Sequence, residues 1–430
     1  MTIFRSLTAS PFLARHPFAV HVLSLLAASL TARLLFLAWL PPHTYSADVQ
    51  SWMNVASTLQ HGENPYNVTT FLNWPPLWMQ LIFVMNKLAL ASGLALETVI
   101  RSLLIGIESA LLVGCYAWLR TLAPPKRAFL LALSAIALNP IAILLVCQHG
   151  NFDVIVGLFV LLGVASLLRF NVESDEREWL YACACLGIAV LAKTVPIVLV
   201  PLLGFGLRHV SWRSRLLGAV LLLGPITLGM SVIYALGPDQ VTANVLHYRS
   251  AAGWFGLTGY FELAQWHRGT ELYSACFAKA LPLTLVAGVI LAFRRTRANA
   301  EELVLFALGL LAMVPGIGPG YAPQYFFWFL ALIPAAIVVS EDRAVRRSLV
   351  WFVAAAVATD LIEYAMFSSH GRFLVRMYPT PTMLELGSDF SSRAGQTLTR
   401  TPLFISWVIM LHAVFGRGLR SLLARPIAET

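Results

Sequence analysis

The sequence predicts an all-α polytopic membrane protein with about twelve transmembrane helices. Apolar residues make up 58% of its 430 residues and charged residues only 12%, and the mean hydropathy is +0.74. In a water-soluble domain about a quarter of the residues are charged, whereas roughly 20 consecutive apolar residues suffice for one membrane-spanning helix. The composition therefore excludes soluble enzymes, disordered scaffolds and nucleic-acid-binding proteins.

The distribution of basic residues favours the same fold class. The net charge is +9, but Lys and Arg occur in short clusters between apolar stretches, which is the positive-inside pattern of membrane proteins. A nucleic-acid-binding surface would be less interrupted and would lie on a soluble domain. The clusters are Arg120/Lys126/Arg127, Arg208/Arg213/Arg215, Arg294/Arg295/Arg297, Arg343/Arg346/Arg347 and Arg417/Arg420/Arg425.

One apolar segment decides the expected topology. Residues 76–91 are short for a transmembrane helix, so they could cross the bilayer or lie on its surface. Placing them on the surface puts most basic residues of the downstream loops in the cytoplasm, whereas a crossing would reverse that balance. An interfacial helix is therefore favoured, with both termini in the cytoplasm. The expected spans are residues 18–40, 99–119, 128–147, 152–168, 179–192, 195–207, 216–236, 276–293, 302–316, 324–340, 348–367 and 402–416.

The whole chain, residues 1–430, is expected to form a single integral membrane domain with three long extracytoplasmic loops. These loops are residues 41–98, which contain the interfacial helices, residues 237–275 and residues 368–401. The candidate functional residues lie in these loops or at the outer ends of the spans.

The first external loop contains the candidate catalytic acid, Asp48. It follows the first span, in a stretch without Lys or Arg before Lys87. A carboxylate at the boundary between water and membrane can accept a proton from a substrate hydroxyl. The alternative is a helix cap, because Asp is favoured at helix N-termini and helical periodicity follows it. Glu63, later in the loop, is a candidate for binding sugar or acceptor.

A short polar turn joins the third and fourth expected spans. Residues 148–153 read Gln-His-Gly-Asn-Phe-Asp, although a turn by itself requires only the Gly and the Asn. Ionisable side chains at membrane depth cost about 2.5–3.5 kcal/mol each on insertion scales, so those that occur tend to be functional. His149, Asn151 and Asp153 are therefore candidates for binding sugar or acceptor. His149 could instead be a satisfied interhelical hydrogen-bond donor.

Cations expected at the outer face are candidates for binding a phosphate. Lys193 lies at an outer turn, against the positive-inside trend, and the alternative interpretation is a snorkelling lysine. Arg249 lies beside His247 in the second long loop, and its guanidinium can bind phosphate through two hydrogen bonds. Gln324 and Tyr325 add an amide and an aromatic ring where the tenth span begins.

These elements place an acid, a polar turn and at least two cations on one face, which suits a leaving phosphate rather than a nucleotide. In the order of these elements along the chain, the sequence resembles the GT-C glycosyltransferases, which are polytopic enzymes that use a polyprenyl- or dolichyl-phosphate sugar as donor. Asp48 is similar to that family's catalytic acid, and the resemblance covers most of residues 20–335. Asn73-Trp74-Pro75-Pro76-Leu77 is similar to the family's Y-P-P-L element, with Trp in place of Tyr. Asn139-Pro140 and residues 149–153 are similar to its N-P and H/G-Q-F-N/D signatures. Lys193, Arg249 and Gln324-Tyr325 lie at positions where the family has donor-site residues.

The resemblance implies a GT-C-like fold and an inverting transfer of a hexose. Asp48 would deprotonate an acceptor hydroxyl, which attacks C1 of the sugar as the lipid phosphate departs. Arg249, with Lys193 as a second cation, would stabilise the phosphate charge. No cofactor is implied, and a divalent metal is possible without being required. The residues expected to contact sugar or acceptor are His149, Asn151, Asp153, Glu63, His247, Gln324 and Tyr325.

One departure from the family bears on the acceptor. Protein O-mannosyltransferases usually have paired acids in the first loop, whereas here Asp48 is followed by Val49. A lipid-linked or glycan acceptor is therefore expected, and mannose is the favoured sugar. The expected location is a bacterial inner membrane, with the site facing the periplasm.

Two other functions remain open from the sequence. A secondary transporter or lipid flippase would place its substrate residues in the middle of the membrane, often in repeated halves, whereas here the polar groups are expected at one face and no repeat is found. A noncatalytic subunit of an envelope-polysaccharide assembly would tolerate loss of Asp48. Arg33, in the first span, is expected to pair with an acid such as Glu108, Asp360 or Glu363, and could alternatively meet a donor phosphate.

Overall fold

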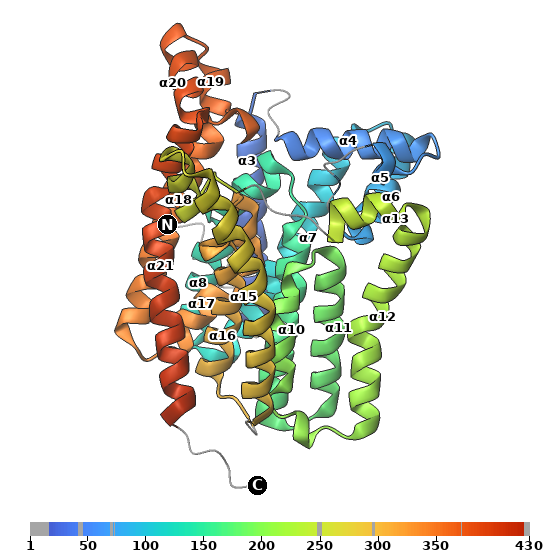
Figure 1. Cartoon of the computed structure of the whole chain (residues 1–430), viewed down its shortest axis with the longest axis vertical. Helices are drawn as coiled ribbons and strands as arrows, with labels where there is room; N and C mark the ends of the chain where they lie inside the picture. The colour runs from blue at the N-terminus through green and yellow to red at the C-terminus, as the bar shows by residue number, and fades with distance from the viewer. Residues whose placement is uncertain are drawn as a thin grey trace.

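The computed structural model describes residues 17–41, 46–68, 72, 74–246, 252–294, 297–370 and 372–424. Within these residues every regular element is a helix, and the β contact is an isolated antiparallel bridge between Ala252 and Gly320. The long helices run side by side in one bundle, with shorter helices at the end that carries α4, α19 and α20 (Figure 1). This end is called the α4 end below. The predicted all-α fold class is confirmed for the described residues.

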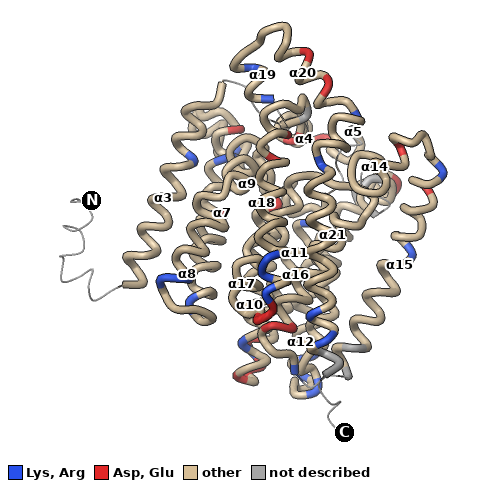
Figure 2. The backbone as a smooth tube through the Cα atoms, turned by 90° about the vertical axis from the view of Figure 1, so that its left-hand side faces the viewer, with Lys and Arg blue, Asp and Glu red and all other residues tan. Residues whose placement is uncertain are grey.

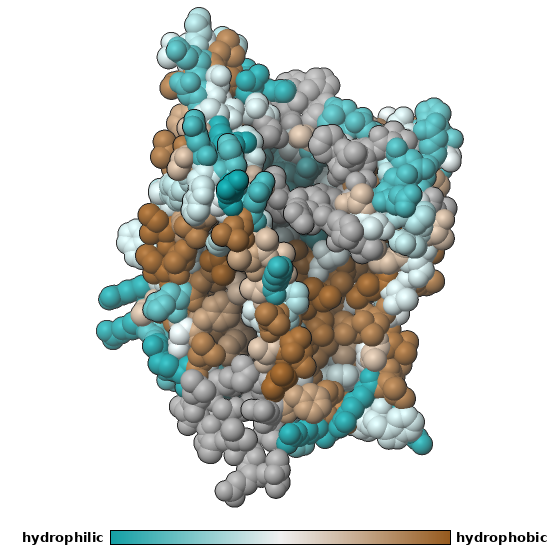
Figure 3. Space-filling model, in the orientation of Figure 1, coloured by the Kyte–Doolittle hydropathy of each residue, from teal (hydrophilic) through white to brown (hydrophobic). Residues whose placement is uncertain are grey.

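Eight helices in the described part of the chain are long and apolar enough to cross a membrane. Hydrophobic residues cover the middle of the molecular surface, with hydrophilic residues toward the two ends (Figure 3). These are the features of a multi-pass membrane protein, as predicted. The eight helices are α3 (Pro17–Trp39), α7 (Leu96–Leu122), α10 (Asp153–Glu173), α12 (Trp212–Leu236), α15 (His267–Arg294), α16 (Ala300–Ile317), α18 (Arg343–Met366) and α21 (Arg393–Ala424).

The predicted count of about twelve spans is not confirmed, because the remaining expected spans are short or broken. One of them is a pair of helices bent by 44°, and counting it as a span gives nine. Proline explains the breaks, since it has no backbone N–H and clashes with the preceding helical turn. The bent pair is formed by α8 (Pro125–Ala132) and η1 (Leu133–Ala137) with α9 (Pro140–Ile143) and η2 (Leu144–His149). The other short or broken segments are α11 (Glu176–Ala192), the 3₁₀ helix η3 (Val195–Gly204), and η6 (Pro323–Trp328) with α17 (Leu332–Val339).

A buried ion pair stabilises the bend before Pro140. Arg33 of α3 donates to the carboxylate of Glu108 on α7 through Nε, at 2.5 Å, and through Nη2. Its Nη1 donates to the carbonyl oxygens of Ala137, at 2.7 Å, and Ser29, at 3.0 Å. Where a helix ends, carbonyl groups lose their intrahelical partners, and the guanidinium provides one. The expectation that Arg33 pairs with an intramembrane acid is thus confirmed.

Residues 41–98, expected to form the first external loop, contribute three helices to the α4 end. α4 (Ala47–Gln60) lies crosswise over the long helices, with α5 (Pro65–Val68) and α6 (Pro76–Ser92) beside it (Figure 1). α6 starts with Pro at its first position, where the missing N–H costs nothing, and ends at Gly93, whose φ is 69°. It packs against α4, α7 and α11. The expected position of α6 on the membrane surface stays a prediction.

Several basic clusters lie at the opposite end of the bundle from α4. α10 starts at Asp153 near α4, and its 21 residues carry the chain about 30 Å to the other end. There Arg297 donates to Ser174, and Arg417 pairs with Glu301 at 2.9 Å. Lys and Arg gather at this end, near α12 and the C-terminal trace (Figure 2). The first loop and these clusters therefore occupy opposite ends, as the sequence predicts.

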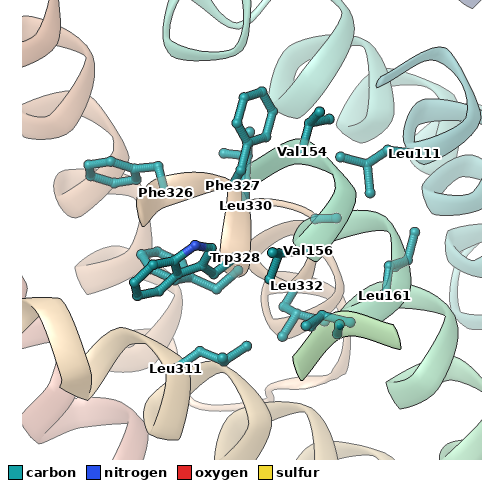
Figure 4. Close-up of a cluster of buried hydrophobic side chains, with 14 of the residues drawn as sticks. Leu111, Val154, Val156, Leu161, Leu311, Phe326, Phe327, Trp328, Leu330 and Leu332 are labelled. Carbon is teal, nitrogen blue, oxygen red and sulfur yellow. The ribbon is translucent and has the colours of Figure 1, made fainter. Parts of the chain in front are cut away.

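The core between α7, α10, α16 and the η6–α17 segment positions η6 beside the α4 end. Gly157 of α10 allows close contact, because a Cβ atom there would lie 2.3 Å from the carbonyl oxygen of Phe327. Any larger residue at 157 would move η6 away from α10. Buried side chains of this core include Leu111, Val154, Val156, Leu161, Leu311, Phe326, Phe327, Trp328, Leu330 and Leu332 (Figure 4).

Candidate active site

Asp48 lies in the first turn of α4. The N-cap residue of this helix is Ser46, so Asp48 is not the helix cap that its position in the sequence allowed. The Ser46 hydroxyl donates to the carbonyl oxygen of His149 at 2.7 Å, which joins the start of α4 to the polar turn at residues 148–153. The side chain of Asp48 is 29% exposed, so a substrate hydroxyl can reach the carboxylate.

Two buried side chains hold one oxygen of the Asp48 carboxylate. His149 Nε2 lies 3.0 Å from Oδ2, and Asn151 Nδ2 donates to the same oxygen at 2.8 Å. Among the residues described, none donates a hydrogen bond to Oδ1. The carboxylate is therefore fixed through one oxygen, while the lone pairs of the other are available to a substrate.

The same contacts keep Asp48 ionised. Burial raises the pKa of the carboxyl, but the hydrogen bond and positive charge of His149, the hydrogen bond from Asn151 and the charge of Lys193 outweigh it. The pKa of Asp48 therefore lies below its usual value of 3.8. A general base has to be deprotonated before it accepts a proton, and Asp48 meets this condition at neutral pH.

Gly150 allows the polar turn to approach α4 closely. Its φ of 66° is in the left-handed region, and a Cβ atom would lie 2.6 Å from Cγ2 of Val49. Trp52 of α4 donates to the Gly150 carbonyl oxygen at 3.2 Å, and the Asn151 side chain accepts from the Asp153 N–H at 2.8 Å. The turn thus brings His149 and Asn151 to Asp48, as expected of residues at neighbouring outer ends of spans.

The other side of His149 contacts α18. Nδ1 of the imidazole forms a short hydrogen bond with the Tyr364 hydroxyl. Gln148 donates to the carbonyl oxygen of Tyr364 at 3.2 Å and to that of His370 at 2.7 Å. The interpretation of His149 as an interhelical hydrogen-bonding residue is therefore confirmed, and the same side chain also contacts Asp48.

Asp153 and Lys193 form a buried ion pair beside this site. Lys193 Nζ lies 2.9 Å from both carboxylate oxygens of Asp153, and the Asp153 side chain is completely buried. Asp153 thus holds Lys193 and has no exposed surface for the sugar contact expected of it. The lysine charge is balanced by this acid, and its side chain is 14% exposed, so it is not the snorkelling residue that the sequence allowed.

Three aromatic rings surround the Lys193 ammonium. Nζ lies 5.0 Å from the ring centre of Tyr325, 5.2 Å from Trp328 and 5.5 Å from Phe152, distances at which a cation is attracted to the ring face. Tyr325 therefore contacts the lysine, and its expected contact with sugar stays a prediction. Gln324 is next to it, and its buried Oε1 has no hydrogen-bond partner among the described residues.

Glu63 is not brought to Asp48. Glu63 follows the far end of α4, about 20 Å along the helix from Asp48, and is exposed; its expected contact with sugar or acceptor stays a prediction. His247 and Arg249 lie outside the described residues, so their expected roles stay predictions. At the α4 end the surface is hollowed beside α4, with hydrophilic residues in its depth (Figure 3).

Another buried cation, Arg400, lies near residues 252–255 and was not among the candidates. Arg400 of α21 donates to Glu363 of α18, at 2.6 Å through Nε, and to the carbonyl oxygen of Trp254, at 2.9 Å. This pair attaches the segment before α14 (Gly256–Leu263) to α18 and α21. In the described part of the chain no three His, Cys, Asp or Glu side chains are grouped to hold a metal ion.

Comparisons with known proteins give matches among solved structures. No protein-family model matches the chain, and no curated protein matches it. A solved structure is similar. It is the crystal structure of ArnT from Cupriavidus metallidurans bound to undecaprenyl phosphate, with a TM-score of 0.49 and 15% sequence identity over 92% of this chain and 78% of that chain. At this level the similarity carries no conclusion about function.

Proposed function

We propose that this chain is an integral membrane glycosyltransferase that moves a hexose from a polyprenyl-phosphate donor to a lipid-linked or glycan acceptor, with inversion at the anomeric carbon. Mannose is the favoured sugar. The reaction takes place at the α4 end, which faces the periplasm of a bacterial inner membrane. The observation that carries the proposal is the Asp48 carboxylate, which His149 and Asn151 hold through Oδ2 and whose side chain is 29% exposed.

In this proposal Asp48 is the general base. An acceptor hydroxyl about 2.6–3.2 Å from Oδ1 is within reach for proton transfer. The acceptor oxygen forms a bond to C1 of the sugar while the bond from C1 to the lipid phosphate breaks. The hydroxyl proton passes to Oδ1, and the electron pair of the broken bond stays on the phosphate. A single displacement of this kind inverts C1.

The departing phosphate gains negative charge, which a nearby cation stabilises. Lys193 is close enough for its charge to lower the pKa of Asp48, and in this proposal it shares its charge between Asp153 and the phosphate. Arg249, which lies outside the described residues, is the second cation. Gln324 and His247 stay candidates for binding sugar or acceptor. The proposal needs no cofactor or resident metal.

A reconstituted transfer assay tests the function. The full-length chain is placed in proteoliposomes with polyprenyl-phosphate mannose and an extract of envelope lipids and glycans as acceptor. Mass spectrometry should detect polyprenyl phosphate and a product heavier than the acceptor by one hexose. Polyprenyl-phosphate glucose in a parallel reaction tests the choice of sugar. Movement of the donor across the bilayer without a covalent product would contradict the proposal and would favour a flippase.

A further inference from the structure

The imidazole of His149 lies between titratable side chains from three different elements. Asp48 of α4 faces Nε2, and Tyr364 of α18 faces Nδ1. The ring of His370, in η7 (Ser368–His370), lies 5.6 Å from the His149 ring, centre to centre. Of these groups the mechanism above uses Asp48 alone, so the role of Tyr364, behind His149, is open.

Hydrogen-bonding chemistry restricts the states of this imidazole. An ionised carboxylate only accepts, so His149 Nε2 carries a proton in its bond with Asp48. In the neutral ring Nδ1 is then an acceptor, and the Tyr364 hydroxyl donates to it. If the ring is protonated, Nδ1 donates, and the same hydroxyl can turn and accept. Tyr364 thus satisfies Nδ1 in either state, whereas a buried nitrogen without a partner costs free energy.

We propose that Tyr364 is a positioning residue for Asp48, because its hydroxyl holds the His149 ring in the orientation in which Nε2 donates to Asp48 Oδ2. The functional part of this inference rests on the proposed role of Asp48 as base. The backbone geometry favours a fixed arrangement, because the Gln148 amide group bonds the carbonyl oxygens of Tyr364 and His370. The polar turn and the end of α18 are therefore joined through both main chain and side chain.

The other charged groups around the ring leave Asp48 as the anion that faces it. Burial, the largest cause, together with positive charge at His149 and Arg400, lowers the pKa of His370 well below 6.5, so His370 is neutral at neutral pH. Glu363, 3.9 Å from His370 Nδ1, accepts two hydrogen bonds from Arg400. The chain Tyr364–His149–Asp48 is thus a distinct unit within the polar network.

Removal of one hydroxyl group tests the inference. Tyr364→Phe should lower kcat about tenfold, and the acidic limb of the kcat/KM pH profile should move to higher pH, because Asp48 loses an aligned donor and its pKa rises. The matched control is Tyr116→Phe. The Tyr116 hydroxyl, on α7, lies 2.5 Å from Nδ1 of His21, on α3. This is the same type of contact between two other helices. This control should leave the rate and the pH profile unchanged.

A double-mutant cycle separates positioning from a general structural effect. His149→Gln keeps an N–H donor for Asp48 but has no ring nitrogen for Tyr364 to hold. In the His149→Gln background, Tyr364→Phe should therefore change kcat less than twofold, compared with about tenfold in the wild type. An equal loss in both backgrounds would overturn the inference.

Nitrogen NMR gives a readout that does not depend on activity. In the full chain labelled with ¹⁵N-histidine and placed in nanodiscs, protonated and unprotonated ring nitrogens have different shifts, and His149→Gln identifies the signals of His149. The wild type should show one sharp signal for a protonated Nε2, and Tyr364→Phe should broaden or split this signal, because the ring no longer keeps a single orientation. An unchanged spectrum together with an unchanged pH profile would overturn the inference even if transfer occurs. A changed spectrum in a chain that transfers no sugar would support the inference and contradict the proposed function.

Discussion

Substituting Gly150 tests how the polar turn is attached to α4. The φ of Gly150 is 66°, and a Cβ atom would lie 2.6 Å from Cγ2 of Val49, which is 1% exposed. A left-handed conformation costs a residue with a Cβ about 1–2 kcal/mol, and displacing a buried neighbour costs roughly 1–3 kcal/mol more. Gly150→Ala should therefore lower the free energy of unfolding by about 2–5 kcal/mol.

Gly93→Ala is the matched control for this substitution. Gly93 has a φ of 69°, but no atom lies within 4 Å of the position that a Cβ atom would take. This variant should therefore lose only the conformational part, about 1–2 kcal/mol. Adding Val49→Ala to Gly150→Ala removes the clashing methyl group. The double variant should recover the part of the loss that comes from the contact, less about 0.8 kcal/mol for each buried methyl group removed.

Reversible unfolding in mixed detergent, followed by tryptophan fluorescence, measures these differences. Gly150 lies between the two residues that hold Asp48, so Gly150→Ala should also reduce sugar transfer, whereas Gly93→Ala should not. Equal destabilisation by the two glycine substitutions would refute the reasoning, because the contact with Val49 would then cost nothing.

Two further predictions concern charge. Asp153→Asn leaves Lys193 without its counter-charge and should destabilise the protein by about 3–5 kcal/mol, measured by thermal unfolding in detergent. Asp153→Asn combined with Lys193→Met should recover most of this loss. Equal losses in the single and double variants would contradict the ion-pair assignment. The pKa of Asp48 lies below 3.8, so its stabilising contribution is present above its unfolded pKa and is lost as the pH falls through its folded pKa. Between about pH 7 and pH 5, protonation of Asp48 should therefore not reduce kcat/KM. Asn151→Ala removes a hydrogen bond to Asp48 and should move the acidic limb of the kcat/KM pH profile to higher pH. An acidic limb that does not move would argue against this contact.

Part of the site follows from helix order. Asp48, His149 and Asn151 lie at the expected outer ends of early spans, so the sequence could predict that they share one face. The ion pair of Asp153 and Lys193 could also have been predicted. The two residues are 40 positions apart, at the start of α10 and just after the end of α11, and consecutive antiparallel helices bring such positions together.

The contribution of α18 could not be predicted in this way. Tyr364 is 215 residues from His149, and their contact depends on how the whole bundle packs. Of the polar residues on α18, Asp360 and Glu363 were considered only as possible partners of Arg33, which pairs with Glu108. The number of spans stays unconfirmed for a related reason, because hydropathy counts apolar residues and does not detect where the backbone is broken.

The most direct test of the central claim compares two Asp→Asn substitutions. Asp48→Asn keeps the size of the side chain and removes the base, whereas Asp239→Asn makes the same change at an exposed acid on α13 (Pro238–Val241). In single-turnover reactions with polyprenyl-phosphate mannose, Asp48→Asn should transfer sugar about 10²–10⁴-fold more slowly than the wild type. Asp239→Asn should match the wild type. Transfer by Asp48→Asn at the wild-type rate would contradict the assignment of Asp48 as the catalytic base.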